Sequence, residues 1–140
     1  SEQGYDFNRH SLVFRITWGD VGFLLTGDLT GDKEHILLQR GLSLESTVMQ
    51  VPHHGSHLSS YPAFLDAVGA DIAVASLGYE NRFGFPRPEV MERYAKAGTS
   101  LYRTDLSGAV TVSTDGTSIE VSCFLPCEPF HPRGGSRTDD

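Results

Sequence analysis

The sequence predicts an α/β fold in which a mixed β-sheet carries helices on one of its faces. Three observations lead to this prediction. Short apolar segments rich in β-branched and aromatic residues alternate with helix-like segments through the middle of the chain. Hairpin-like segments flank this alternating region at both ends. Alternation favours parallel strands whereas hairpins are antiparallel, so we expect both kinds of strand pair in one architecture.

The first half of the chain is expected to begin with a hairpin. Its strands are residues 11–18 and 23–26, joined by a glycine-rich turn. The period then changes in residues 30–40, where acidic residues near the start and Gly41 after the end predict a short helix. Residues 47–51 form the next strand, which is too apolar for an exposed edge.

The second half continues the alternation. Residues 62–68 are a predicted helix that starts with proline, with Ser59 or Ser60 as its cap. Residues 71–77 form a continuous apolar strand of the kind that is buried on both faces. Residues 88–97 are another helix with proline at its start. Three further strands are predicted at 101–103, 109–113 and 118–124, the last two forming a hairpin through Asp115-Gly116.

Length and composition restrict the possible classes of protein. A chain of 140 residues with 39% hydrophobic residues is one domain that can bury a core. The net charge of -7 argues against a broad basic face that grips nucleic acid. It does not exclude a nuclease, because bound cations offset acidic ligands locally. No signal peptide is visible and no apolar run approaches the roughly 18 residues of a membrane span, so we expect a soluble chain.

Two cysteines, Cys123 and Cys127, stand near the end of the chain with three residues between them. Without further cysteines or a nearby pair of histidines, this spacing is weak support for a zinc site. A disulfide is possible but not indicated, and we expect one thiol at a strand end and one in the tail.

The residues that carry chemistry follow two predicted strands. Asp28 ends the segment Leu-Leu-Thr-Gly-Asp, and His53 and His54 end the segment Val-Pro-His-His. A carboxylate and an imidazole at strand ends are suitable ligands for a divalent metal. In a strand the two histidines would point to opposite faces, so that one could bind metal while the other orients a neighbour or contacts substrate. A turn aspartate and structural histidines are the alternatives that remain open.

Other histidines and other catalytic motifs do not compete with this site. His57 is expected in a solvated loop, and three further histidines are expected at the surface: His10, His35 and His131. The chain contains neither a G-x-S-x-G nucleophile elbow nor a phosphate-binding loop. Ser56 lies only three residues after His53 and has no oxyanion-loop signature, which argues against a serine triad.

The order of these motifs resembles a known family. The segments TGD, VPHHGS, PAFLDAV, NRFGFPRPEV and YRTDLSGAV follow one another as in the C-terminal half of a metallo-β-lactamase-fold domain. More narrowly, the chain resembles the C-terminal domain of ComEC-type competence proteins, the polytopic channels that carry transforming DNA into bacteria. The resemblance runs from about Asn8 to Gly116 and implies half of an αββα sandwich. Residues 1–125 would be this half-domain, and residues 126–140, rich in Pro, Gly and charge, a disordered tail.

The resemblance also implies a site with two divalent metals, zinc or manganese. Asp28 would bridge the metals, His53 or His54 would be a further ligand, and Asp28 and His54 would act in catalysis. The family's H-x-H-x-D-H motif, which holds most of the first metal, does not occur in this chain. We therefore expect little or no bound metal and no activity in this fragment. Relatives carry G-H-P-H-P where this chain has Phe85 and Arg87, and the guanidinium of Arg87 could contact a phosphate.

The function implied by the resemblance is hydrolysis of the DNA strand that is not imported, by a soluble domain of a protein in the bacterial cell membrane. Its partners would be DNA, the rest of the channel protein, and a second copy packed on the open sheet face. The alternatives are another hydrolase of this fold, such as a phosphorylcholine esterase, and a non-catalytic scaffold that has lost its metals.

Overall fold

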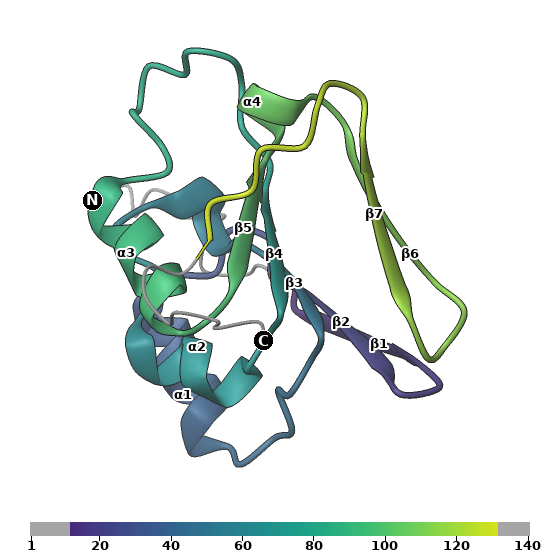
Figure 1. The fold of residues 1–140 in the computed structure, drawn as a ribbon. Helices are drawn as coiled ribbons and strands as arrows, with labels where there is room; N and C mark the ends of the chain where they lie inside the picture. Colours follow the sequence, from purple (N-terminus) through teal and green to yellow (C-terminus); the bar gives the residue numbers. More distant parts are fainter. Residues whose placement is uncertain (1–11, 132–140) are drawn as a thin grey trace, which may run out of the picture.

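The centre of the molecule is a mixed five-stranded sheet, seen in a computed structural model that describes residues 12–131. Its strand order is β1-β2-β3-β4-β5 (Figure 1). The first pair is the predicted antiparallel hairpin, and the other three pairs are parallel. The prediction of a mixed sheet is therefore confirmed. The strands are β1 (Phe14–Trp18), β2 (Val21–Leu25), β3 (Val48–Gln50), β4 (Ile72–Ala75) and β5 (Ser100–Arg103).

Three helices cover one face of this sheet: α1 (Gly31–Gln39), α2 (Pro62–Val68) and α3 (Pro88–Lys96) (Figure 1). The buried core between the sheet and the helices includes Leu24, Met49, Phe64, Tyr94 and Leu101. Two short elements were not predicted: the 3-10 turn η2 (Pro52–Gly55) and α4 (Thr104–Ser107). Within residues 12–131, none of the helices has the length and apolar character needed to cross a membrane.

Two expectations about these elements need correction. Neither Ser59 nor Ser60 caps α2, because its N-cap is Tyr61 and no cap side chain accepts a hydrogen bond there. The carboxylate of Glu34 accepts instead, from the backbone N–H of Ser60 at 2.6 Å and of Tyr61 at 3.0 Å. The strand β4 is fully buried on one face only: Ala73 and Ala75 lie in the core, whereas Ile72 and Val74 are half-buried.

The second hairpin lies on the side of the sheet away from the helices (Figure 1). Its strands β6 (Val110–Thr114) and β7 (Ile119–Cys123) form a separate two-stranded sheet, as the Asp115-Gly116 turn predicted. The tips of the two hairpins touch, because the backbone N–H of Asp20 donates to the oxygen of Gly116 at 2.7 Å. Between β6 and the sheet is an apolar cleft of about 380 Å³. This face is therefore only partly covered, as expected for half of a sandwich.

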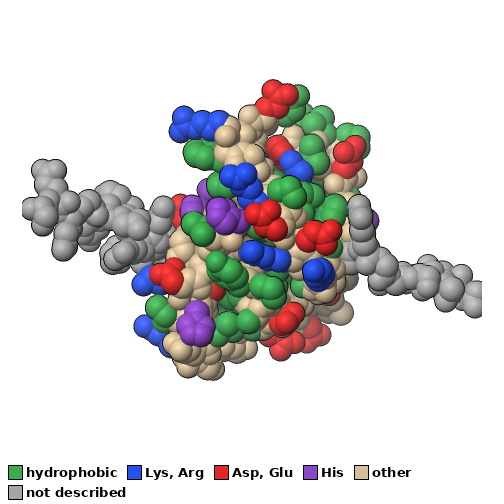
Figure 2. Space-filling model, turned by 90° about the vertical axis from the view of Figure 1, so that its left-hand side faces the viewer, with side chains coloured by type: hydrophobic (Ala, Val, Ile, Leu, Met, Phe, Trp, Pro, Cys, Tyr) green, Lys and Arg blue, Asp and Glu red, His purple; other side chains and the backbone are tan. Residues whose placement is uncertain are grey.

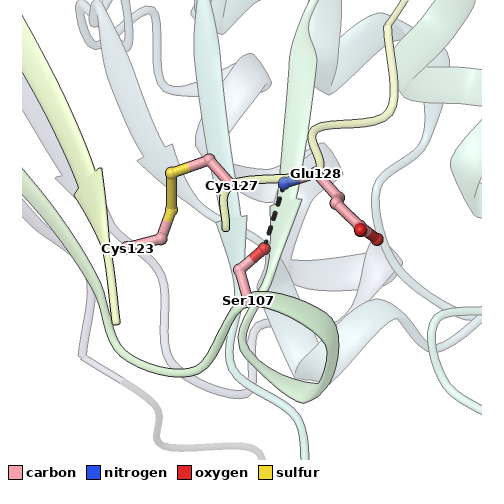
Figure 3. Close-up of a disulfide and its surroundings, with 4 residues drawn as sticks. All are labelled: Ser107, Cys123, Cys127 and Glu128. Carbon is pink, nitrogen blue, oxygen red and sulfur yellow. Dashed lines mark hydrogen bonds between the residues drawn. A yellow bond between two sulfur atoms is a disulfide. The ribbon is translucent and has the colours of Figure 1, made fainter. Parts of the chain in front are cut away.

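A disulfide joins β7 to the segment that follows it (Figure 3). Cys123 and Cys127 are bridged, with a Cα–Cα distance of 5.4 Å, so the expectation of two separate thiols is wrong. After the bridge, the N–H of Glu128 donates to the hydroxyl of Ser107 at 3.3 Å (Figure 3). A tail disordered from residue 126 is also wrong as far as His131, since Phe130 pairs with Leu101 of β5. Residues 132–140, and His10, lie outside the described residues.

Candidate functional site

The site lies where two neighbouring parallel strands end. The chain leaves β2 through Thr26 and Gly27 to reach Asp28, and it leaves β3 directly into the turn that carries His53 and His54. Because β2 and β3 are parallel neighbours, their carboxyl ends meet at one edge of the sheet. A carboxylate oxygen of Asp28 lies 3.3 Å from Nε2 of His54. The structure thus brings together two side chains that are 26 positions apart in the sequence.

The side chain of Gln50 fastens the two strand ends to each other. Its amide oxygen accepts from the backbone N–H of Thr26 and of Gly27, both at 3.0 Å. The hydroxyl of Thr26 donates to the backbone oxygen of Gln50, also at 3.0 Å. The N–H of His53 donates in turn to the backbone oxygen of Gly27 at 3.0 Å. These four bonds, three of which involve the side chain of Gln50 or Thr26, hold the Thr-Gly-Asp turn in register with the histidine turn and thereby place Asp28 beside His54.

The two histidines do not continue a strand, so the prediction that they point to opposite strand faces is wrong. They lie in η2 with φ angles of 50° for His53 and 54° for His54. Consecutive non-glycine residues in this left-handed region are uncommon and cost free energy, and such residues cluster at functional sites. Gly55 follows with a φ of 86°, and a Cβ at its position would lie 2.5 Å from the Cβ of Pro86. A glycine is required there because the loop around Pro86 packs directly on the turn.

The two imidazoles have different environments. Nδ1 of His54 lies 2.8 Å from the backbone oxygen of Ser76. Because a carbonyl oxygen only accepts, Nδ1 carries the proton, and Nε2 faces the Asp28 carboxylate. Two lone pairs would then meet across 3.3 Å unless a proton or a shared cation lies between them. Nδ1 of His53 is buried and has no hydrogen-bond partner in the described part of the chain.

A cavity of about 600 Å³ opens over these side chains. This volume is in the range of small-ligand sites. Its lining combines the polar cluster with the loop after β4: Asp28, His53, His54, Ser76, Leu77, Gly78, Asn81, Phe83 and Phe85. On the helix-covered side of the molecule, a group of histidine side chains lies beside Lys and Arg side chains (Figure 2).

The side chains in this cavity are of the chemical types that bind a divalent metal, but too few of them are placed to bind one together. A carboxylate oxygen and imidazole nitrogens are ligands of zinc and manganese, and a backbone carbonyl that orients a ligating histidine is common around such sites. A catalytic zinc, however, takes three protein ligands. Within residues 12–131, no group of three or more His, Cys, Asp and Glu side chains is placed to hold a metal ion.

The loop that carries Phe85 and Arg87 forms one wall of the cavity. The ring of Phe85 lies 6.4 Å from the ring of His53, and the guanidinium carbon of Arg87 lies 5.9 Å from the centre of the Phe85 ring. A phenyl ring, which offers no metal ligand, therefore lies close to the histidines. Arg87 stays exposed beside it.

Sequence reasoning missed a second carboxyl group, Glu34, on the helix-covered side. Burial raises the pKa of its carboxyl to about 7, although the N–H groups of Tyr61 and Ser60 and the charge of Arg93 lower it. Arg93 donates to the backbone oxygens of His57 at 3.2 Å and Ser59 at 2.9 Å. The hydroxyls of Ser60 and Tyr94 lie 2.8 Å apart, and burial raises the pKa of the tyrosine. These contacts hold the segment between the histidine turn and α2. No local sequence motif predicts them.

The fold and this site define a class of protein. The model of the family described as "Metallo-beta-lactamase superfamily" matches residues 2–79. The chain belongs to that superfamily. The mixed sheet with helices on one face agrees with a fragment of its fold. No solved structure matches the chain significantly.

Among curated proteins, the chain is similar to competence proteins. It is 43% identical over 106 residues to "Competence protein ComA" of Neisseria gonorrhoeae, covering 75% of this chain and 15% of that protein. It is 34% identical over 114 residues to "Recombination protein 2" of Haemophilus influenzae, covering 81% and 14%. It is 29% identical over 103 residues to "ComE operon protein 3" of Bacillus subtilis, covering 74% and 13%. The chain thus spans about one seventh of the length of these relatives, and the resemblance to competence proteins is confirmed.

Proposed function

We propose that this chain is part of a metal-dependent phosphodiesterase domain in a DNA-uptake protein of the bacterial cell membrane. The complete domain would hydrolyse the DNA strand that is not imported. The observation that carries the proposal is the Asp28–His54 pair, 3.3 Å apart in the cavity where β2 and β3 end. The similarity to a competence protein over 75% of the chain supplies the biological setting.

In this proposal Asp28, His54 and His53 are ligands of zinc or manganese. The bound metal would activate a water molecule and stabilise the negative charge that develops on the phosphate. His54 presents Nε2 because the Ser76 carbonyl holds the proton on Nδ1. His53 offers a buried Nδ1 that no described protein group satisfies. Asp28 would offer its carboxylate oxygens to the metal, and a positive charge held there would offset the repulsion between the lone pairs of Asp28 and those of His54.

The remaining ligands have to come from outside the residues described here. In the resembled family they belong to the H-x-H-x-D-H motif, which is absent from this sequence. We therefore expect the 140-residue chain by itself to retain well under one equivalent of metal after dialysis, and to cleave no DNA with Mg²⁺, Mn²⁺ or Zn²⁺.

A non-catalytic scaffold is the second candidate. Its support is the phenyl ring of Phe85 beside His53, together with the small number of donors. In a scaffold, a proton on Nε2 of His54 would make the contact with Asp28 a simple ion pair.

The deciding experiment uses the full-length protein, with metal content measured by elemental analysis and cleavage measured on labelled DNA. Asp28→Ala should remove both bound metal and cleavage. His57→Ala is the matched control, because His57 is exposed and its side chain does not line the cavity. A wild-type protein without metal would favour the scaffold. Strong Asp28-dependent cleavage by the 140-residue chain alone would show that its ligand set is larger than the structure indicates.

A further inference from the structure

The loop after β4, residues 78–87, exposes aromatic side chains next to the candidate site. Tyr79 is 78% exposed and Phe83 is 53% exposed. Phe85 is half-buried and lines the cavity together with Phe83. Large rings left in water carry a cost in solvation, and aromatic rings at such positions are typical of binding surfaces.

The rings form a continuous row that leads away from the histidines. His53 and Phe85 are 6.4 Å apart with their planes tilted by 59°. Phe85 and Phe83 are stacked, with centroids 5.4 Å apart and planes 19° apart. The outer ring, Phe83, is exposed, whereas the inner end is the imidazole of His53, whose Nδ1 has no hydrogen-bond partner among residues 12–131. A ligand on the row would therefore extend from the cavity to the surface.

Each phenyl ring of the row has an arginine beside it. The guanidinium carbon of Arg82 lies 5.0 Å from the centre of Phe83, and that of Arg87 lies 5.9 Å from the centre of Phe85. Both arginines are exposed, and Glu80 is the only acidic residue among positions 78–87. A positive loop in a chain of net charge -7 is a local exception. A guanidinium group binds phosphate through paired hydrogen bonds and can at the same time stack on a ring.

The loop is held in place by its own contacts. The side-chain amide of Asn81 donates to the oxygen of Phe85 at 2.8 Å and accepts from the N–H of Phe85 at 2.9 Å. The N–H of Arg87 donates to the oxygen of Gly55 at 3.0 Å, which ties the loop to the histidine turn. These hydrogen bonds fix the shape of the loop, and a loop held in shape loses less entropy when a ligand binds.

From these observations we infer that residues 78–87 are a platform on which the bases of single-stranded nucleic acid stack. This inference rests on the proposed function of the adjacent site. Rings that stack on bases, combined with arginines that follow the backbone, are how proteins bind single strands without reading sequence. In a duplex the bases are stacked on each other and their faces are closed to such rings. The platform gives the site its substrate class: an unpaired strand whose bases rest on Phe83 and Phe85 and whose phosphates pair with Arg82 and Arg87, next to the cavity that Asp28 and His54 line.

The test is fluorescence anisotropy of the 140-residue chain with a labelled thymidine oligonucleotide, in EDTA so that neither metal nor cleavage contributes. An abasic oligonucleotide with the same number of phosphates should bind ~10-fold more weakly, because it has no bases to stack. A duplex of the same length should also bind more weakly. Phe83→Ala should weaken binding of the thymidine strand ~10-fold, and Phe83→Tyr should restore it. Phe124→Ala removes an equally large ring that is 84% exposed elsewhere, and it should leave binding unchanged.

The salt dependence provides an independent measurement. If Arg82 and Arg87 each neutralise one phosphate, the logarithm of the binding constant should fall with a slope of about -1.4 against the logarithm of salt concentration. Arg82→Ala should reduce that slope by about 0.7, whereas Arg40→Ala, an exposed arginine after α1, should not. Equal affinity for thymidine and abasic strands, tighter binding of the duplex, or no binding at all would overturn the inference.

The inference and the proposed function can fail separately. Binding in EDTA that depends on Phe83, with no metal or cleavage in the full-length protein, would leave the platform standing and remove the phosphodiesterase. Cleavage that depends on Asp28, with no effect of Phe83→Ala on strand binding, would do the reverse.

Discussion

The two faces of the five-stranded sheet differ in what covers them. On the helix-covered face, Phe64 is 0% exposed and Leu24 is 1% exposed. On the opposite face, Phe14 is 54% exposed and Trp18 is 64% exposed, although these side chains are just as apolar. The comparison teaches that apolar content alone does not stabilise a fold. A side chain contributes when a second layer removes it from water, and only one face has a complete second layer.

The largest expected effect is a difference in stability between matched truncations on the two faces. Phe64→Ala should lower the free energy of unfolding by ~3–5 kcal/mol, because it leaves a cavity in the core. Phe14→Ala removes the same atoms from the open face and should cost within about 0.5 kcal/mol. Urea titration followed by circular dichroism measures both changes. Similar costs for the two variants would mean that the open face is covered in solution.

The next largest effect is a pH dependence of stability caused by Glu34, which is buried on the helix-covered face. The pKa of the Glu34 carboxyl is raised from 4.5 to about 7, so the folded chain holds a proton that the unfolded chain releases. The stabilisation by the neutral carboxyl is complete below about pH 4.5 and is lost as the pH rises through 7. The total change is about 3 kcal/mol. Unfolding titrations between pH 4 and 8 should show this decrease.

Glu34→Gln should flatten this pH dependence, since the amide does not titrate. The exposed Glu89 on α3 offers the control, because Glu89→Gln should leave the slope as it is in the wild type. A slope that persists in Glu34→Gln would assign the titration to another group.

A smaller effect is expected from the disulfide that fastens the second hairpin over the open face. Opening a bridge across so short a loop should cost about 2 kcal/mol by the loop-entropy relation. Replacing both Cys123 and Cys127 with serine should reproduce the effect of a reductant on the wild type, and the reductant should then leave the variant unaffected. Thermal unfolding with and without reductant measures this, and an unchanged midpoint would show that the bridge adds nothing to stability.

The smallest effect on stability is expected when a charged residue is placed on the open face. Such a substitution should change the oligomeric state of the chain and leave its free energy of unfolding nearly unchanged. Exposed apolar side chains on β1 should cause self-association, in the simplest case as a symmetric dimer through this face. Ile16→Lys should keep the free energy of unfolding within about 0.5 kcal/mol and reduce the association seen by sedimentation velocity. His35→Lys, exposed on α1, is the control. A wild-type chain that stays monomeric at high concentration contradicts this prediction.

Features with local causes could be predicted from the sequence. The sequence predicts helix α2 at about residues 62–68, where the structure has it, because Pro62 opens the helix and Gly69, with a φ of 60°, closes it. The Asp115-Gly116 turn located the second hairpin for the same reason. The sequence also shows that Asp28 and the two histidines each follow a predicted strand, which is why it singles them out as candidate ligands.

Features that depend on distant contacts could not be predicted. The left-handed turn at His53 and His54 is held by Gly27 and packs on Pro86, and the choice of His54 as the partner of Asp28 depends on the carbonyl of Ser76. The contact between Glu34 and the segment before α2 has no local signal either, because its partner Ser60 lies 26 residues further along the chain. The pairing of Phe130 with Leu101 likewise has no signal in a segment rich in proline.

The bridge between Cys123 and Cys127 also has a consequence in terms of redox compartment. Disulfides form and persist in oxidising surroundings such as the periplasm or the cell exterior, and they are rare where glutathione and thioredoxin keep thiols reduced. A closed bridge between these two cysteines is therefore expected where this part of the chain faces an oxidising compartment. Alkylation of thiols in intact cells, followed by mass analysis of the peptide that contains both cysteines, should find the bridge closed; two alkylated thiols would contradict this expectation.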